Sequence, residues 1–224
     1  MHRICTIVLL LLIDQSLACT APSFTNITVQ ANFNLTKFLG TWYEIEWLPG
    51  EPHAEADIWR DFVQSFQLEN GSNVRLSVPG KFRLLNNDTC FSFGPWSIVA
   101  NNSAKMVLER KSPTSPKPNN WPYYVIKTDY DNYALIYGCS VDGYNLTEPC
   151  TAPIIWLFGR KVILADGYRK DMDNYIANTL CVNLTRMEIT PHGATTCSNQ
   201  PLSGSSSLSL NVLLFFAAVF ILFT

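Results

Sequence analysis

The chain has 224 residues, of which 15% are charged and 47% hydrophobic, and its formal net charge at pH 7 is −2. This length allows one substantial domain with a sizeable core. Because the net charge is small and both signs are interspersed, the composition gives no reason to expect binding to nucleic acid or electrostatic attachment to a membrane surface.

The first 18 residues have the layout of a secretory signal peptide. Arg3 is followed by an apolar run over residues 4–13 and then by Ser16, Leu17 and Ala18. A basic start, an apolar centre and small residues before the cleavage point are typical of such signals. We expect cleavage after Ala18, which leaves a mature domain over residues 19–200.

Short runs rich in β-branched and aromatic residues follow, separated by turn signals such as Asn70-Gly71. Trp42 begins the first run, and the later runs cover residues 62–69, 73–85, 90–99, 104–109, 122–128, 133–140 and 151–159. Short strands at this spacing predict an all-β barrel or sandwich.

One helix is predicted after these strands, over residues 166–180. Asp166 is a suitable N-cap, and apolar or small side chains recur at the spacing of one helix face: Met172, Tyr175, Ile176, Thr179 and Leu180. We expect this face to pack against the outside of the sheet, and a short strand to follow over residues 184–190.

The C-terminal residues 201–224 resemble an attachment signal for a glycosylphosphatidylinositol (GPI) anchor. No Lys, Arg, Asp or Glu follows Glu188, and a small polar stretch over residues 203–207 precedes an apolar run over residues 208–224. The apolar run is shorter than the ~20 residues of a usual membrane span and lacks a basic flank. We therefore expect GPI attachment at Ser203 or Gly204; a plain membrane-spanning tail is the alternative.

Cysteines and glycosylation sequons both indicate a secreted chain. Cys5 leaves with the signal peptide, and an even number of cysteines then remains, which predicts three disulfides of unknown connectivity. The Asn-x-Ser/Thr sequons begin at Asn26, Asn34, Asn70, Asn87, Asn101, Asn145 and Asn183. Each asparagine that carries a glycan must face water.

Three short motifs resemble those of the lipocalins, which are secreted barrels that hold small apolar ligands. In chain order they consist of Gly40 and Trp42, then Thr128, Asp129 and Tyr130, and finally Arg160 at the end of the last predicted strand. The resemblance covers about residues 19–197. It implies an eight-stranded antiparallel up-and-down barrel with one C-terminal α-helix packed on its outside.

The resemblance also assigns these motifs a structural role. It implies that Arg160 lies across the face of Trp42 and closes the narrow end of the barrel. A desolvated pair of this kind contributes ~2 kcal/mol, and the guanidinium can also bind backbone carbonyls. The motif residues are therefore expected to hold the fold together and not to contact the ligand.

If Arg160 points inward, alternation along its strand directs Ile154, Trp156 and Phe158 inward as well. Alternation in the other strands, together with the resemblance, adds Phe62, Phe66, Phe91, Phe93, Met106, Leu108, Tyr123 and Ile136. An eight-stranded barrel has room for one small ligand, so these residues are the predicted ligand-binding lining. The alternative is that they only pack a solid core. Trp156 is the best single candidate, because the family position that it matches lies in the pocket.

In the first strand, alternation places Glu44 and Glu46 on the side of Trp42 and directs Trp47 toward the helix. An inward carboxylate is costly unless it is paired, and Lys127 is a candidate partner. The alternative is that the strand twists Glu46 into solvent.

The resemblance implies one disulfide directly and leaves two to be assigned from the remaining cysteines. An N-terminal cysteine of the relatives pairs with one after the seventh strand, and the tail cysteine pairs with an early strand, for which Cys90 is the substitute here. The expected bridges are Cys19–Cys139, Cys90–Cys197 and Cys150–Cys181.

The expected function is binding of a small hydrophobic ligand, such as a sterol, retinoid, fatty acid or pigment, on the outer leaflet of the plasma membrane. The tail and the sequons resemble those of a GPI-anchored lipocalin implicated in axon guidance, which implies a role in guidance or in protection from stress. The alternative is a recognition or adhesion protein that uses the barrel as a scaffold for a cell-surface protein partner, independently of ligand.

An enzymatic function is not expected. One lipocalin branch uses a nucleophilic cysteine on an early strand, and this chain has none there. His53 and His192 remain after signal cleavage, and neither belongs to a metal-ligand or nucleophile–base pattern. No metal and no cofactor are expected.

Overall fold

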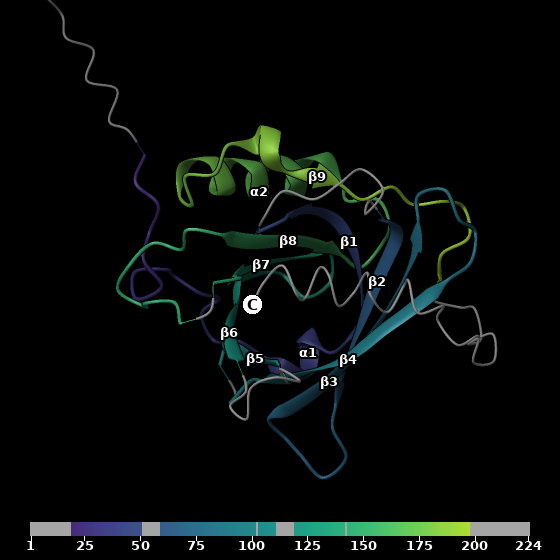
Figure 1. The fold of residues 1–224 in the computed structure, drawn as a ribbon, viewed down its shortest axis with the longest axis horizontal. Coiled ribbons are helices and arrows are strands. Elements are labelled where there is room, and N and C mark those ends of the chain that lie inside the picture. The colour runs from purple at the N-terminus through teal and green to yellow at the C-terminus, as the bar shows by residue number, and fades with distance from the viewer. Residues whose placement is uncertain (1–18, 51–58, 102, 111–118, 142, 198–224) are drawn as a thin grey trace, which may run out of the picture.

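Antiparallel strands wrap in chain order into a closed barrel (Figure 1). The computed structural model describes residues 19–50, 59–101, 103–110, 119–141 and 143–197. The barrel strands are β1 (Gly40–Leu48), β2 (Trp59–Leu68), β3 (Arg75–Leu84), β4 (Phe91–Val99), β5 (Lys105–Arg110), β6 (Asn119–Thr128), β7 (Tyr133–Cys139) and β8 (Pro153–Gly159). Because β1 pairs with both β8 and β2, the sheet closes on itself. The predicted eight-stranded up-and-down barrel is confirmed.

Strand boundaries depart from the predicted ones mainly at three places. β2 and β6 each begin a few residues earlier than predicted. The strand predicted over residues 184–190 is a 3₁₀ turn, Leu184–Arg186, followed by the two-residue β9 (Glu188–Ile189). β9 pairs with β1 where β1 no longer pairs with β2. The C-terminal segment therefore covers the part of β1 that β2 leaves open.

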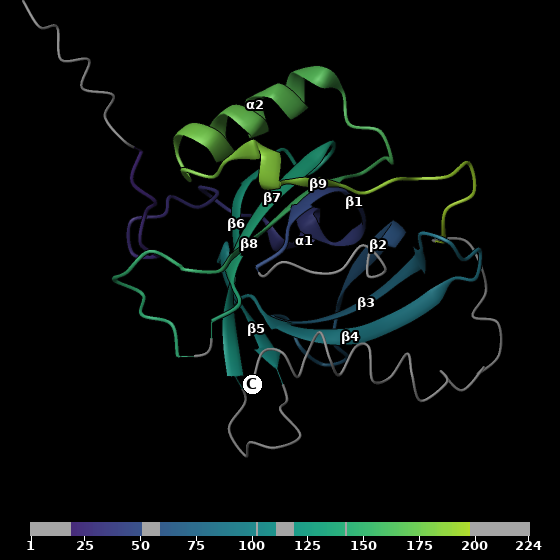
Figure 2. The same cartoon turned by 45° about the horizontal axis from the view of Figure 1, so that its top comes forward.

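The helix α2 (Asp166–Asn178) lies along the outside of the barrel, as Figures 1 and 2 show. Its cap is Ala165, and Asp166 is the first helical residue, where its charge is favourable to the helix dipole. Met172 and Ile176 are buried between the helix and the outer face of the sheet. The predicted packing of this face is therefore present in the structure.

Two apolar clusters follow from alternation along the strands. The inner cluster lies inside the barrel and contains the motif tryptophan Trp42 together with Phe66, Tyr123 and Phe158. The outer cluster lies between the barrel and α2 and contains Leu157 among others. Adjacent β8 residues thus belong to different clusters, as a period of two requires.

A bulge in β1 reverses the alternation that the sequence predicts there. Glu44 lies opposite Phe158, but the next paired residue is Glu46, which lies opposite Leu157. A bulge inserts one extra residue and moves the following side chains to the other face. Glu46 consequently faces α2, where it forms an ion pair with Arg169. The predicted inward orientation of Glu46 is wrong.

The structure also corrects the predictions for Trp47, which follows the same bulge, and for Lys127 on β6. Trp47 lies opposite Trp156 and packs on the inner cluster, so its predicted orientation toward the helix is also wrong. Lys127 was the expected partner of a buried glutamate. Its ammonium instead lies 4.5 Å from the ring centroid of Tyr175 on α2, a cation–π contact.

The disulfides differ from the expected set in two of three pairs. Cys139 ends β7 and is bonded to Cys150, which closes the short connection to β8. This local bridge leaves Cys19 to bond with Cys181, just beyond the end of α2, at a Cα–Cα distance of 5.4 Å. The expected Cys19–Cys139 and Cys150–Cys181 pairs are therefore wrong. The structure contains the third expected pair, Cys90–Cys197.

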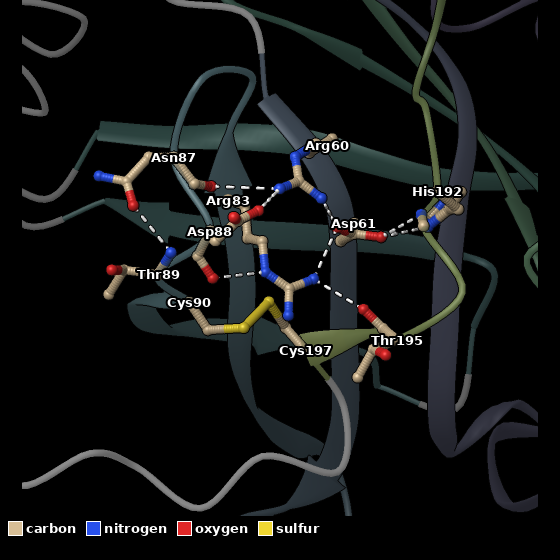
Figure 3. The surroundings of a disulfide bond; sticks show 11 residues. Arg60, Asp61, Arg83, Asn87, Asp88, Thr89, Cys90, His192, Thr195 and Cys197 are labelled. Carbon is tan, nitrogen blue, oxygen red and sulfur yellow. Dashed lines mark hydrogen bonds and ion pairs between the residues drawn. A yellow bond between two sulfur atoms is a disulfide. The ribbon is translucent and has the colours of Figure 1, made fainter.

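The C-terminal segment is held to the barrel by an ionic cluster beside the Cys90–Cys197 bond (Figure 3). The Asp61 carboxylate is fully buried and accepts hydrogen bonds from Arg60, Arg83 and the backbone N–H of Gly193, at 2.7–2.9 Å. The Arg83 guanidinium also donates to the carbonyl oxygen of Thr195. A buried carboxylate is tolerated here because it is paired on several sides.

Candidate functional site

One end of the barrel is closed by Arg160 and Trp42. The Arg160 guanidinium carbon lies 3.6 Å from the centroid of the Trp42 ring. Its nitrogens donate hydrogen bonds to the carbonyl oxygens of Thr41, Tyr130 and Leu39, at 2.9–3.0 Å. One side chain therefore joins the start of β1, the preceding turn and the β6–β7 turn.

Gly40 is required for this closure. Its φ of +98° is a conformation that residues with a side chain rarely adopt, and a Cβ there would lie 3.3 Å from Arg160 Nη1. The helix α1 (Leu35–Phe38) precedes it, and the Trp42 indole donates a 2.8 Å hydrogen bond to the carbonyl oxygen of Phe38. The glycine thus lets the chain leave α1 and enter β1 under the guanidinium.

The β6–β7 turn is built by the side chains of Thr128 and Asp129. The Thr128 hydroxyl donates to the Tyr133 carbonyl and accepts from the Tyr130 N–H. Partial burial acts to raise the pKa of Asp129, but hydrogen bonds from Asn132 and from neighbouring backbone N–H groups hold it below its ordinary value. These motif residues position the Tyr130 carbonyl that Arg160 binds.

The structure brings the predicted lining residues together in the inner cluster. Trp156 lies opposite Trp47 of β1 and Ile136 of β7, and its ring centroid is 5.5 Å from that of Tyr123. The buried residues among those predicted to line the barrel all belong to the inner cluster. The two partly exposed ones, Phe91 and Phe93, pack against it. Several strands therefore direct aromatic side chains toward the interior of the barrel.

Trp47 and Trp59 are lining residues that the sequence analysis missed. Their rings lie 4.4 Å apart, and both pack on the inner cluster. Trp59 precedes a second irregularity, in β2, where Asp61 has a φ of +56°. Alternation counted back from Phe62 would direct Trp59 outward, so its inward position needs this bulge.

Three polar side chains lie inside the barrel, and all three are almost completely buried: Glu44, Gln64 and Tyr123. Glu44 Oε1 accepts hydrogen bonds from Trp59 Nε1 at 2.7 Å and from Thr190 Oγ1 at 2.6 Å. Among the residues that the structure describes, Glu44 Oε2, both amide atoms of Gln64 and the Tyr123 hydroxyl have no hydrogen-bond partner. Each such group costs about 1–3 kcal/mol.

Burial also changes how these groups ionise. It raises the pKa of Glu44 from 4.5 to about 7, although hydrogen bonds from Thr190 and Trp59 oppose the rise. The nearby charge of Glu188 adds to it. Burial likewise raises the pKa of Tyr123 well above 10, and the charge of Glu44 contributes. The interior therefore holds a carboxyl that changes charge near neutral pH.

The cysteines and the histidine that the structure describes have structural partners. The six cysteines from Cys19 to Cys197 are all in disulfides. Within residues 19–50, 59–101, 103–110, 119–141 and 143–197, no three or more His, Cys, Asp or Glu side chains are grouped so that they could hold a metal ion. His192 lies in the C-terminal segment that follows β9, with Nε2 at 2.6 Å from the Glu44 backbone carbonyl.

The seven sequon asparagines are all exposed, as glycosylation requires. They lie on turns and loops, including those between β2 and β3 and between β3 and β4. The predicted signal peptide, His53, and the predicted attachment signal over residues 201–224 with Ser203 and Gly204 lie outside the described residues. In the part that is described, no helix is long and apolar enough to cross a membrane.

A closed antiparallel barrel with an aromatic interior, an arginine across a tryptophan at one end and a helix on the outside is the architecture of small-molecule-binding lipocalins. No model of a known protein family matches the sequence. The chain is 32% identical over 161 residues to apolipoprotein D of Cavia porcellus, covering 66% of this chain and 72% of that protein. It is 30% identical over 141 residues to apolipoprotein D of Mus musculus, covering 61% and 65% respectively. The chain belongs to the lipocalin family.

Solved structures show the same fold. Apocrustacyanin C2 superimposes with a TM-score of 0.57 at 16% identity and covers 79% of this chain and 91% of its own. Lobster apocrustacyanin A1 gives a TM-score of 0.56 at 18% identity. At these identities the likeness supports the barrel alone.

Proposed function

We propose that this protein binds one small hydrophobic ligand inside its barrel, on the extracellular side of the membrane. The observation that carries the proposal is the interior itself. Aromatic side chains from several strands surround buried polar atoms that have no partner within the described residues. Apolar surroundings with a few polar groups are typical of small-molecule sites.

Burial of the ligand supplies the affinity. Each CH₂ group that leaves water contributes about 0.8 kcal/mol, so a ligand of sterol or retinoid size gains enough to bind without any covalent step. Trp156 is the proposed central contact, because Trp47, Ile136 and Tyr123 surround it. The other proposed contacts are Phe62, Phe66, Phe91, Phe93, Met106, Leu108, Ile154 and Phe158.

The proposed location is the outer face of the plasma membrane. The disulfides need an oxidising compartment, and the exposed sequons fit secretion. The signal peptide over residues 1–18 and GPI attachment at Ser203 or Gly204 rest on the sequence pattern. This combination resembles that of the lipocalin Lazarillo, and the proposed roles in axon guidance or in stress protection rest on that resemblance alone.

Substitution of Trp156 by Glu tests the ligand site. The variant is compared with Ile163→Glu, which places the same charge on a residue that is 81% exposed. Mature protein from cells that express the full chain is titrated with N-phenyl-1-naphthylamine, a neutral fluorescent apolar probe. We expect the wild type and Ile163→Glu to bind it, and Trp156→Glu to bind at least about 100-fold more weakly, since an unpaired charge is excluded from an apolar interior.

Equal binding by a folded Trp156→Glu protein would exclude the interior as the site. A cell-surface activity that survives in Trp156→Glu would instead assign that activity to the outer surface of the barrel. Release of the protein from cells by phosphatidylinositol-specific phospholipase C tests the anchor. Failure of release would favour a membrane-spanning tail.

A further inference from the structure

Three strands each direct one buried polar side chain into the barrel. Glu44 on β1 lies opposite Phe158, and Gln64 on β2 lies opposite Trp42, so both face the inner cluster. Tyr123 on β6 is itself a member of that cluster. The closed end of the barrel, with its Arg160 contacts, uses none of the three.

Glu44 is held in one orientation. Trp59 Nε1 and Thr190 Oγ1 both donate to Oε1, which leaves Oε2 without a partner among the described residues. Trp59 in turn packs against the ring of Trp47. Thr190 is fixed by the hydrogen bond from its N–H to the Ile45 carbonyl. The free oxygen is therefore presented to the interior by a rigid support.

We propose that Glu44, Gln64 and Tyr123 bind the polar end of the ligand, and that this end is a neutral hydroxyl group. This inference rests on the proposed function. It narrows the ligand to an amphipathic alcohol, such as a sterol or a retinoid alcohol, whose apolar body lies among the aromatic residues.

The hydrogen-bonding capacity of the three groups supports a hydroxyl. A hydroxyl donates one hydrogen bond and accepts two. It can therefore donate to Glu44 Oε2 while it accepts from the Gln64 amide or from the Tyr123 hydroxyl. A purely apolar ligand would leave all of these groups without hydrogen bonds, although buried polar groups in proteins are almost always hydrogen-bonded.

A ligand carboxylate fits these groups less well. It has no hydrogen to donate to Glu44 Oε2, and an ionised Glu44 would repel it. Like charges within a few ångströms disfavour each other strongly in a buried site. Fatty acids and retinoic acid are therefore expected to bind more weakly than the alcohols of the same skeleton.

Paired alcohols and acids test the inference on the mature protein from cells that express the full chain. Displacement of N-phenyl-1-naphthylamine is measured at pH 8.5, above the pKa of about 7 at which Glu44 ionises, with retinol against retinoic acid and with hexadecanol against hexadecanoic acid. We expect each alcohol that binds to do so about tenfold more tightly than its acid. A tenfold ratio of dissociation constants corresponds to a difference of about 1.4 kcal/mol in binding free energy.

Two interior variants and one matched control sharpen the test. Glu44→Gln removes the charge but keeps an oxygen for Trp59 and Thr190, so we expect it to raise affinity for the acids about tenfold and to abolish the preference for alcohols. Tyr123→Phe removes one oxygen and keeps the ring, and we expect about fivefold weaker alcohol binding. Glu148→Gln removes an exposed charge and should keep the wild-type preference.

The outcomes separate this inference from the proposed function. If the probe binds but neither alcohol is preferred, or none of the four compounds displaces it, the hydroxyl site is refuted while ligand binding stands. Wild-type preference in both interior variants also refutes it, and would mean that water alone pairs the three groups. If the probe and all four compounds fail to bind, the proposed function fails as well.

Discussion

The Glu44→Gln variant should stabilise the protein, and its effect should grow with pH. Glu44 is fully buried, and its pKa rises from 4.5 to about 7 on folding. The folded protein therefore holds this proton more tightly than the unfolded chain. The contribution of Glu44 to stability is fully present below pH 4.5 and is lost as the pH rises through 7.

The magnitude follows from that pKa difference. Each unit is worth about 1.4 kcal/mol, so the complete loss is about 3 kcal/mol. About 2–3 kcal/mol of it should appear between pH 5 and pH 8.5, because part of the titration of the unfolded chain precedes pH 5. Glutamine has no charge to bury and keeps an acceptor for Trp59 and Thr190.

Urea unfolding followed by tryptophan fluorescence, at half-unit intervals from pH 5 to pH 8.5, measures the effect. The groups near the Glu44 carboxyl and backbone that can titrate are Tyr123, Glu188 and His192. They are present in both proteins, so the difference reports the change at Glu44 together with its electrostatic effect on these neighbours. We expect the stability of Glu44→Gln relative to the wild type to rise by about 2–3 kcal/mol across this range, while the exposed Glu148→Gln shows no trend. A difference that does not change with pH would refute the account of Glu44.

Two other predictions concern the closed end and the disulfides. Gly40→Ala should lower the free energy of unfolding by about 1–3 kcal/mol, because its φ is unfavourable for alanine. Gly167→Ala, in the first turn of α2 with open space around it, should raise it by about 0.5–1 kcal/mol. Thermal unfolding of both variants checks the opposite signs, and a stable Gly40→Ala would contradict the required turn. Non-reducing peptide mass spectrometry should find the bridges Cys19–Cys181, Cys90–Cys197 and Cys139–Cys150; a Cys19–Cys139 peptide would overturn the pairing.

Regular strands were predictable because burial alternates along them. On β5, Met106 and Leu108 are buried while Lys105 is exposed, and β8 follows the same period from Ile154 to Phe158. The helix α2 was predictable for the corresponding reason, since Met172 and Ile176 lie one turn apart.

At the candidate site, bulges made the predicted alternation of side-chain orientation wrong. The extra residue in β1 turns Glu46 outward and Trp47 inward, and the irregularity in β2 does the same for Trp59. No local pattern marks either one, because a bulge depends on how two strands pair. The polar contacts of Glu44 follow from these bulges and from the C-terminal segment that supplies Thr190.

The sequence by itself determined the barrel and the aromatic character of the interior, and the resemblance of its short motifs to those of lipocalins implied the closure of one end by Arg160 and Trp42. These depend on alternation, on short motifs and on residue type, which are local properties. Only the tertiary structure decided the disulfide partners and the surroundings of Glu44. Both depend on which segments that are distant in the chain lie side by side in the fold. Local sequence patterns do not indicate these contacts.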